Sequence, residues 1–219
     1  MSIWARARTS LGQELDQPVS PSIGWRHVIG ALTVFFFVVE ILTGILLMVY
    51  YQPTAGDAYD SVQYIMSTAN LGWLVRGLHV WAGTLLVLFA LLHLVRVWGQ
   101  GAYRGGRGFN WGLGVLLLLM LLAFGFTGML LPWDQAAFWT IDEAREAISH
   151  VPFLGPLLLG VLWGGIEELG EGALLRFYVF HVGLLPWITV ALLGLHLYLV
   201  GRQGLHHPGD DEREAGDEK

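Results

Sequence analysis

Two apolar stretches decide the fold: LHVWAGTLLVLFALLHLVRVW at residues 78–98 and YVFHVGLLPWITVALLGLHLYLV at residues 178–200. Each is long enough to cross about 30 Å of hydrocarbon, which takes roughly 20 helical residues. Two further apolar runs occupy residues 28–51 and 111–131. Because backbone polar groups in lipid must be satisfied within their own segment, we expect all four runs to be helices.

The composition also indicates a membrane protein. Of 219 residues, 54% are hydrophobic and 14% are charged, with a mean hydropathy of +0.55, which is too apolar for an ordinary soluble domain. The chain has no cysteine, so disulfides, cysteine-ligated iron–sulfur clusters and thioether-attached haem are excluded. The net charge of −6 comes largely from the end of the chain, and we expect residues 206–219 to form a disordered acidic cytoplasmic tail.

The predicted fold is all-α: an integral membrane four-helix bundle over residues 28–205. Residues 1–27 mix arginines with apolar residues and suit an interfacial segment. Arginines gather on the side of the two termini, so both termini are predicted to be cytoplasmic, with a long outer-face loop at 132–177. Within that loop, the apolar stretch 151–165 is short and broken by prolines, and we interpret it as a surface or re-entrant segment.

Four histidines recur at matched spacing in two of the runs. His79 and His93 are fourteen residues apart, and His181 and His196 are fifteen apart. At about 100° and 1.5 Å per residue, each helix would carry one histidine near each membrane face, on broadly one side. If the two helices face each other in antiparallel fashion, His79 meets His181 near the outer face, and His93 meets His196 near the inner face.

Two opposed imidazoles supply two axial nitrogens and leave four equatorial positions for a planar macrocycle, as a haem requires. One zinc or copper ion could not use all four histidines, because its ligands must lie within a few Å of one metal. We therefore predict two non-covalent b-type haems that carry electrons and bind no substrate at the iron. The alternative is that these histidines form hydrogen bonds between helices.

Glycines repeat at the same interval in the other two runs, as Gly30 and Gly44 and as Gly114 and Gly128. Glycine lets a backbone approach a flat macrocycle closely, so we predict haem contacts at these four positions. The alternative is helix packing through small residues.

Two arginines flank the first pair of histidines along the chain. Arg76 precedes His79 by three residues, and Arg96 follows His93 by three, each at a membrane boundary. Because the guanidinium fork fits a carboxylate, we predict that these arginines bind haem propionates. The alternative is interfacial anchoring.

Three motifs carry a resemblance to a known family. SVQYIMSTANLGWLVR at 61–76, TGMLLPWDQ at 127–135 and RFYVFH at 176–181 closely resemble cytochrome b of cytochrome bc complexes. The likeness extends over about residues 25–205 and is greatest to cytochrome b6, the short form of b6f-type complexes.

The resemblance implies a di-haem cytochrome b subunit of a respiratory or photosynthetic complex that oxidises quinol and reduces a cytochrome c or plastocyanin-type acceptor. His79 and His181 would bind the outer, low-potential haem, and His93 and His196 the inner, high-potential haem. Electrons would pass through both haems from quinol at the outer face to quinone at the inner face. The residues expected at the outer quinol site are Pro132, Trp133, Asp134, Gln135 and Phe138.

The resemblance also implies partners and a location. They are a Rieske iron–sulfur protein, a c-type cytochrome or similar acceptor, and a subunit IV-like chain carrying the family's Pro-Glu-Trp-Tyr segment, which is missing here. A dimeric complex in the bilayer of a bacterial cytoplasmic (inner) membrane is expected, without a nucleic-acid partner. The alternatives are a di-haem membrane anchor of a dehydrogenase or hydrogenase, and a haem-free transporter or scaffold.

Two positions depart from the family pattern. Val28 stands where cytochrome b6 has a cysteine that attaches an extra haem, so no cysteine-attached haem is expected on this chain. Glu40 replaces a common glutamine, and intramembrane carboxylates are costly and usually functional. Our hypothesis is that Glu40 adjusts the potential of the outer haem or conducts a proton. The alternative is a neutral acid that replaces the glutamine's hydrogen bonds.

Overall fold

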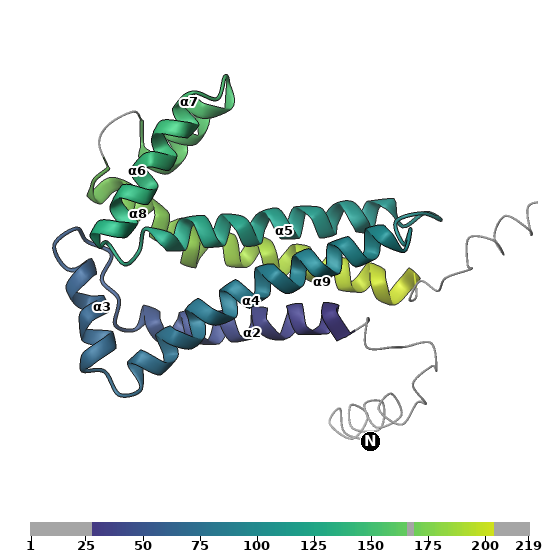
Figure 1. The fold of residues 1–219 in the computed structure, drawn as a ribbon, viewed down its shortest axis with the longest axis horizontal. Helices are drawn as coiled ribbons and strands as arrows, with labels where there is room; N and C mark the ends of the chain where they lie inside the picture. The colour runs from purple at the N-terminus through teal and green to yellow at the C-terminus, as the bar shows by residue number, and fades with distance from the viewer. Residues whose placement is uncertain (1–27, 166–168, 204–219) are drawn as a thin grey trace, which may run out of the picture.

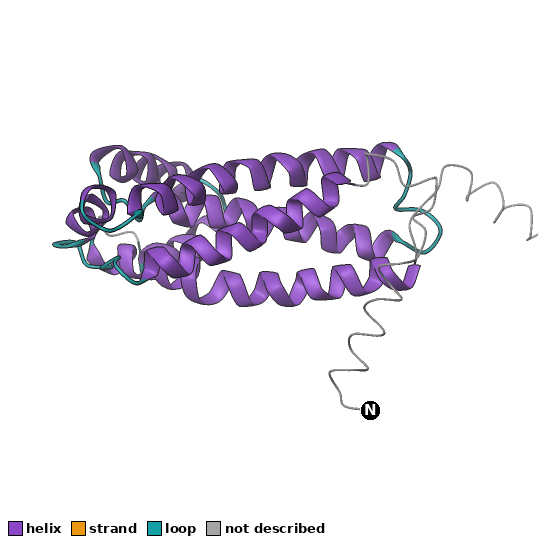
Figure 2. Ribbon diagram, turned by 90° about the horizontal axis from the view of Figure 1, so that it is seen from below, coloured by secondary structure: helices purple, strands orange, loops and turns teal. Residues whose placement is uncertain are grey.

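A computed structural model of the chain describes residues 28–165 and 169–203, all of it helix, turn or loop. Four long apolar helices run side by side (Figures 1 and 2). They are α2 (Val28–Met48), α4 (Gly72–Gly99), α5 (Gly108–Met129) and a composite helix over Glu171–Gln203. All four are long and apolar enough to cross a membrane, which confirms the all-α bundle. The interfacial segment predicted at 1–27 and the tail predicted at 206–219 lie outside the described residues.

Most large apolar side chains of the bundle point outward. Trp187, for example, is 76% exposed and Trp81 is 69% exposed. The bundle's own core is a small cluster of Phe37, Leu86 and Leu121 near its middle. Because outward side chains gain nothing from burial within one chain, this pattern is that of helices solvated by lipid. The helices together with the family relationship described below show an integral membrane protein.

The fourth helix is built of three parts: α8 (Glu171–Tyr178), the π-helix η3 (Val179–Leu184) and α9 (Leu185–Gln203). Pro186 lies at its second junction and has no N–H, which removes one α-helical hydrogen bond. A π turn holds one residue more than an α turn. The fifteen residues between His181 and His196 therefore span nearly the same rise and rotation as the fourteen between His79 and His93.

The expected outer-face loop is largely helical. It contains α6 (Gln135–Ser149), α7 (Leu154–Leu158) and the π-helix η2 (Leu159–Trp163), and α3 (Ala58–Ser67) lies at the same end of the bundle (Figure 1). This end is called the loop end below. The opposite end, where α2 begins, α9 ends and the turn at 100–107 joins α4 to α5, is called the terminus end.

A buried cluster fixes the loop end onto the bundle. Its largest fully buried members are Leu130, Ile141, Leu159, Leu174 and Phe177. Since these residues come from the end of α5, α6, η2 and α8, the short helices pack on the bundle through one common core. The stretch predicted to be surface or re-entrant, 151–165, forms α7 and η2 and is shorter than a membrane span.

Candidate functional site

At the loop end, His79 on α4 faces His181 on η3. Their ring centroids are 6.2 Å apart. Imidazole nitrogens bind first-row metals at about 2 Å, so two rings that share one metal from opposite sides have centroids roughly 6 Å apart. The observed separation therefore fits one iron between the two rings.

Two threonines orient these imidazoles in the same way. Thr43 Oγ1 lies 2.9 Å from His79 Nδ1, and Thr127 Oγ1 lies 3.1 Å from His181 Nδ1. Each hydroxyl donates to the backbone carbonyl four residues earlier, at 2.7 Å, so its oxygen is left to accept the Nδ1–H of the histidine. With the proton on Nδ1, Nε2 is the nitrogen free to bind a metal.

Each of the four predicted glycines lies against one of the four histidine rings. A Cβ built on each glycine would approach the histidine Cε1 at these distances: Gly128 to His181 2.8 Å, Gly30 to His93 3.1 Å, Gly44 to His79 3.3 Å and Gly114 to His196 3.6 Å. A side chain would thus push on the ring in the first three cases and only touch it in the fourth. The glycines seat the imidazoles, and their predicted contact with a macrocycle stays a prediction.

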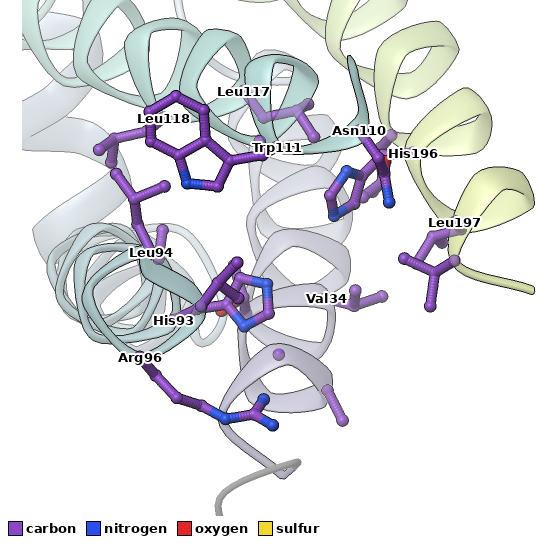
Figure 3. Close-up of a pocket in the computed structure, with 18 of the residues that line it drawn as sticks. Val34, His93, Leu94, Arg96, Asn110, Trp111, Leu117, Leu118, His196 and Leu197 are labelled. Atoms are coloured by element: carbon purple, nitrogen blue, oxygen red, sulfur yellow. The ribbon is translucent and has the colours of Figure 1, made fainter. Parts of the chain in front are cut away.

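At the terminus end, His93 on α4 and His196 on α9 line one cavity of about 410 Å³ (Figure 3). Its walls are mainly apolar side chains of the four long helices, including Val34, Leu94, Leu117, Leu118 and Leu197. Within residues 28–165 and 169–203, neither His93 Nδ1 nor His196 Nδ1 has a hydrogen-bond partner, although both atoms are buried. Since buried polar groups are normally satisfied, an apolar cavity with two such imidazoles fits a large apolar ligand that uses nitrogen donors.

Several polar residues line the same cavity. The sequence predicted Arg96 there, and the structure adds Gln100, Arg107 and Asn110, which the sequence analysis missed. Arg107 also donates to the Gln203 carbonyl at 3.2 Å and so connects the start of α5 with the end of α9. The guanidinium groups of Arg96 and Arg107 are suitable partners for the carboxylates of a bound macrocycle.

Arg76, the other predicted propionate partner, contacts α3 at the loop end. Its guanidinium donates to the Met66 sulfur on α3 at 3.7 Å, near the surface of the loop end. The structure therefore brings Arg76 to α3, and its pairing with a propionate stays a prediction.

The segment predicted to line the quinol site forms a tight turn before α6. Trp133 has a positive φ of 52°, which is strained for a side chain of this size. The Asp134 side chain caps α6 by accepting the Ala137 N–H at 2.8 Å. Trp133 and Phe138 meet edge to face at 6.0 Å, while Gln135 is exposed and accepts a bond from Trp139.

Tyr51, which the sequence analysis missed, fastens this turn to the end of α2. Its hydroxyl donates to the Leu131 carbonyl at 2.8 Å, and its ring stacks on Tyr178 at 5.5 Å. Burial raises the pKa of Tyr51, and the neighbouring Tyr178 raises that pKa further. The phenol therefore stays a neutral donor.

Across the two described ranges, no group of three or more histidine, cysteine or acidic side chains could hold a metal ion. A metal at either histidine pair needs its remaining ligands from a non-protein group, and a porphyrin supplies four in a plane. The residues present thus fit haem at both ends of the bundle.

A four-helix membrane bundle with one facing histidine pair, and with a second pair on one cavity at the other end, is the arrangement expected of a membrane cytochrome. A family model described as cytochrome b/b6/petB matches residues 14–204. The chain belongs to the cytochrome b/b6 family, whose members carry b-type haem.

Relatives and one solved structure agree with this assignment. The chain is 35% identical to cytochrome b6 of Synechococcus sp. over 190 residues, covering 87% of this chain and 88% of the relative. It is 37% identical to cytochrome b6 of Synechocystis sp., covering 87% and 85%. A chain of a hyperthermophilic respiratory Complex III matches with a TM-score of 0.83 at 30% identity, covering 93% of this chain. This chain spans 54% of the length of that Complex III chain.

Proposed function

We propose that this chain is the di-haem cytochrome b subunit of a quinol-oxidising cytochrome bc-type complex, respiratory or photosynthetic. It carries electrons between a quinol-oxidation site at the loop end and a quinone-reduction site at the terminus end. The observation that carries this proposal is the opposed histidine pair at each end, with 6.2 Å between the ring centroids of His79 and His181. The relatives named cytochrome b6 and Complex III support it.

His79 and His181 would hold one haem, and His93 and His196 the other. Bound haem supplies a reversible one-electron change between ferric and ferrous iron. Thr43 and Thr127 keep Nε2 of the loop-end histidines free of a proton, and the four glycines keep all four rings seated. The apolar cluster around Phe37 lies between the two histidine pairs and also lines the terminus-end cavity.

The loop-end turn supports the proposed quinol site. The strained Trp133 and the edge-to-face ring of Phe138 offer flat apolar walls, with Pro132 beside them. Asp134 would act by shaping the turn, because its side chain is engaged as the cap of α6. We place Gln135 at the rim, since its side chain is exposed.

The remaining elements of the proposal concern the assembly. A subunit IV-like chain would supply the Pro-Glu-Trp-Tyr segment, and a Rieske protein and a c-type cytochrome or similar acceptor would take electrons. We also propose that the complex is a dimer in a bacterial cytoplasmic membrane, with both termini of this chain on the cytoplasmic side. The arginine distribution supports the orientation.

The test is the haem content of the complex purified through this chain. We expect two b-type haems per polypeptide, two redox transitions and a co-purifying Rieske protein. The His181→Leu and His196→Leu variants should each lose one haem. A control is His150→Leu, because His150 is an exposed loop-end histidine outside both sites. Two results would refute the proposal: wild-type protein without haem, or both haems retained after replacement of His93 and His196. Co-purification of a dehydrogenase in place of the Rieske protein would favour the membrane-anchor alternative.

A further inference from the structure

Helices α2 and α5 place equivalent residues 84 positions apart in the chain. Gly44 and Gly128 each lie against a loop-end histidine, and the threonine before each glycine contacts the Nδ1 atom of that histidine. The same offset relates the terminus-end glycines. The two sides of the loop-end site are therefore close to a repeat of one arrangement.

Glu40 breaks this repeat. It precedes Thr43 by three residues, and the equivalent residue on α5 is Phe124. Glu40 Oε2 lies 3.1 Å from His79 Nδ1. Phe124 instead presents its ring to His181, edge to face at 5.5 Å. His79 Nδ1 thus lies beside a carboxylate oxygen as well as a threonine oxygen, whereas the side chain at the equivalent position near His181 is an aromatic ring without an acceptor oxygen.

The position of Glu40 is built into the packing of α2 on α4. The carboxyl group lies directly against Gly83 of α4, since a Cβ built on this glycine would be in ordinary van der Waals contact with the Glu40 carboxyl carbon, at 3.6 Å. The Glu40 side chain is only 17% exposed, and within the described part of the chain its Oε1 has no hydrogen-bond partner. Placing an acidic side chain at membrane depth costs free energy, and such residues usually have a function. The contact between Glu40 and His79 indicates where that function lies.

We propose that Glu40 is a positioning residue for His79 that sets the two axial ligands of the loop-end site apart. Together with Thr43 it holds the Nδ1–H of His79, so that Nε2 faces the iron and the imidazole is a stronger electron donor than that of His181. A second acceptor on Nδ1 raises the basicity of a metal-ligating histidine, and a more basic ligand favours the ferric state. This inference rests on the proposed function, because it requires a haem between His79 and His181.

The test is a redox titration of the intact complex, in which the loop-end transition is the one lost in His181→Leu. Glu40→Phe copies the α5 side of the site and removes one acceptor, and Glu40→Gln keeps an acceptor of the same size without the acid. Outer-shell partners typically change metal binding about 10–100-fold. We expect Glu40→Phe to reduce the preference for the ferric state about tenfold, which raises the loop-end midpoint potential by about 59 mV for one electron.

Glu40→Gln should shift the same transition by less, keep both haems, and alter the low-spin ferric EPR signal of the loop-end haem only. The control is Glu146→Gln, because Glu146 is a largely exposed loop-end acid that lies against His150. A shift confined to the loop-end transition supports the proposal. The proposal is overturned if neither Glu40 variant shifts the loop-end midpoint potential, or if both transitions shift equally. If Glu40→Phe does not assemble, Glu40→Gln alone still provides the test. A wild-type complex without haem would instead overturn the proposed function.

Discussion

Replacing Gly128 by alanine should displace the imidazole of His181. The new Cβ would lie 2.8 Å from Cε1, and ordinary contact begins at 3.4 Å, so the ring must retreat by about 0.6 Å. That movement also disturbs the 3.1 Å contact between Thr127 and Nδ1. Overpacking of this kind costs about 1–3 kcal/mol, which corresponds to about 5–150-fold weaker binding of a ligand held by the displaced ring.

The measurement is haem per polypeptide, with reduced-minus-oxidised spectra that resolve the two sites. Gly114→Ala is the matched control in the same helix, because its Cβ would meet His196 at an ordinary 3.6 Å. We expect haem loss to fall in the order Gly128, Gly30, Gly44, Gly114. Equal loss in Gly114→Ala and Gly128→Ala, or a Gly128→Ala complex with a fully retained loop-end haem, would refute this reasoning.

Three further predictions concern individual contacts. Asp134→Ala removes the cap of α6 and should destabilise the loop end by about 1 kcal/mol, seen as faster proteolysis near α6 with the haem content unchanged; Glu143→Ala, at an exposed position inside α6, is the control. The raised pKa of Tyr51 means that the unfolded chain loses this proton near pH 10 while the folded chain keeps it, so stability should fall as pH rises above about 10, and thermal unfolding of Tyr51→Phe should show a smaller fall. Thr127→Val removes the acceptor at His181 and should weaken loop-end haem binding by about 1 kcal/mol, whereas Thr84→Val, which loses only an intrahelical bond, should leave it unchanged.

The membrane helices and the histidine pairs could be predicted because lipid imposes long apolar runs and a helix converts spacing into direction. The sequence pattern did not predict the short helices of the loop end. Residues 135–149 mix apolar and charged residues and follow an acid suited to capping, a signal that was available in Asp134. The apolar pieces α7 and η2 are too short for their type to be read from the pattern.

The contacts around the histidines needed the relative rotation of neighbouring helices. The sequence places Thr43 before Gly44 and Thr127 before Gly128, and this repeated Thr-Gly pair could have suggested a shared role. The contact between Glu40 and His79 depends instead on the rotation of α2 about its own axis relative to α4, which is set by side-chain packing between the two helices. Arg107 and Asn110 were missed for the same reason, since they reach the cavity only because α5 starts beside the end of α9.

The π turn at η3 makes the fourth helix differ from α4, the other helix that carries two of the histidines. Its additional residue corresponds to about 100° of rotation in a regular α-helix. Straightening the turn without shortening the chain would swing one imidazole away from its site while the other stayed in place. The two histidine helices therefore cannot be exchanged, or grafted into a designed bundle, without regard to this turn. Pro186 and the additional residue near Gly183 must either both be kept or both be removed.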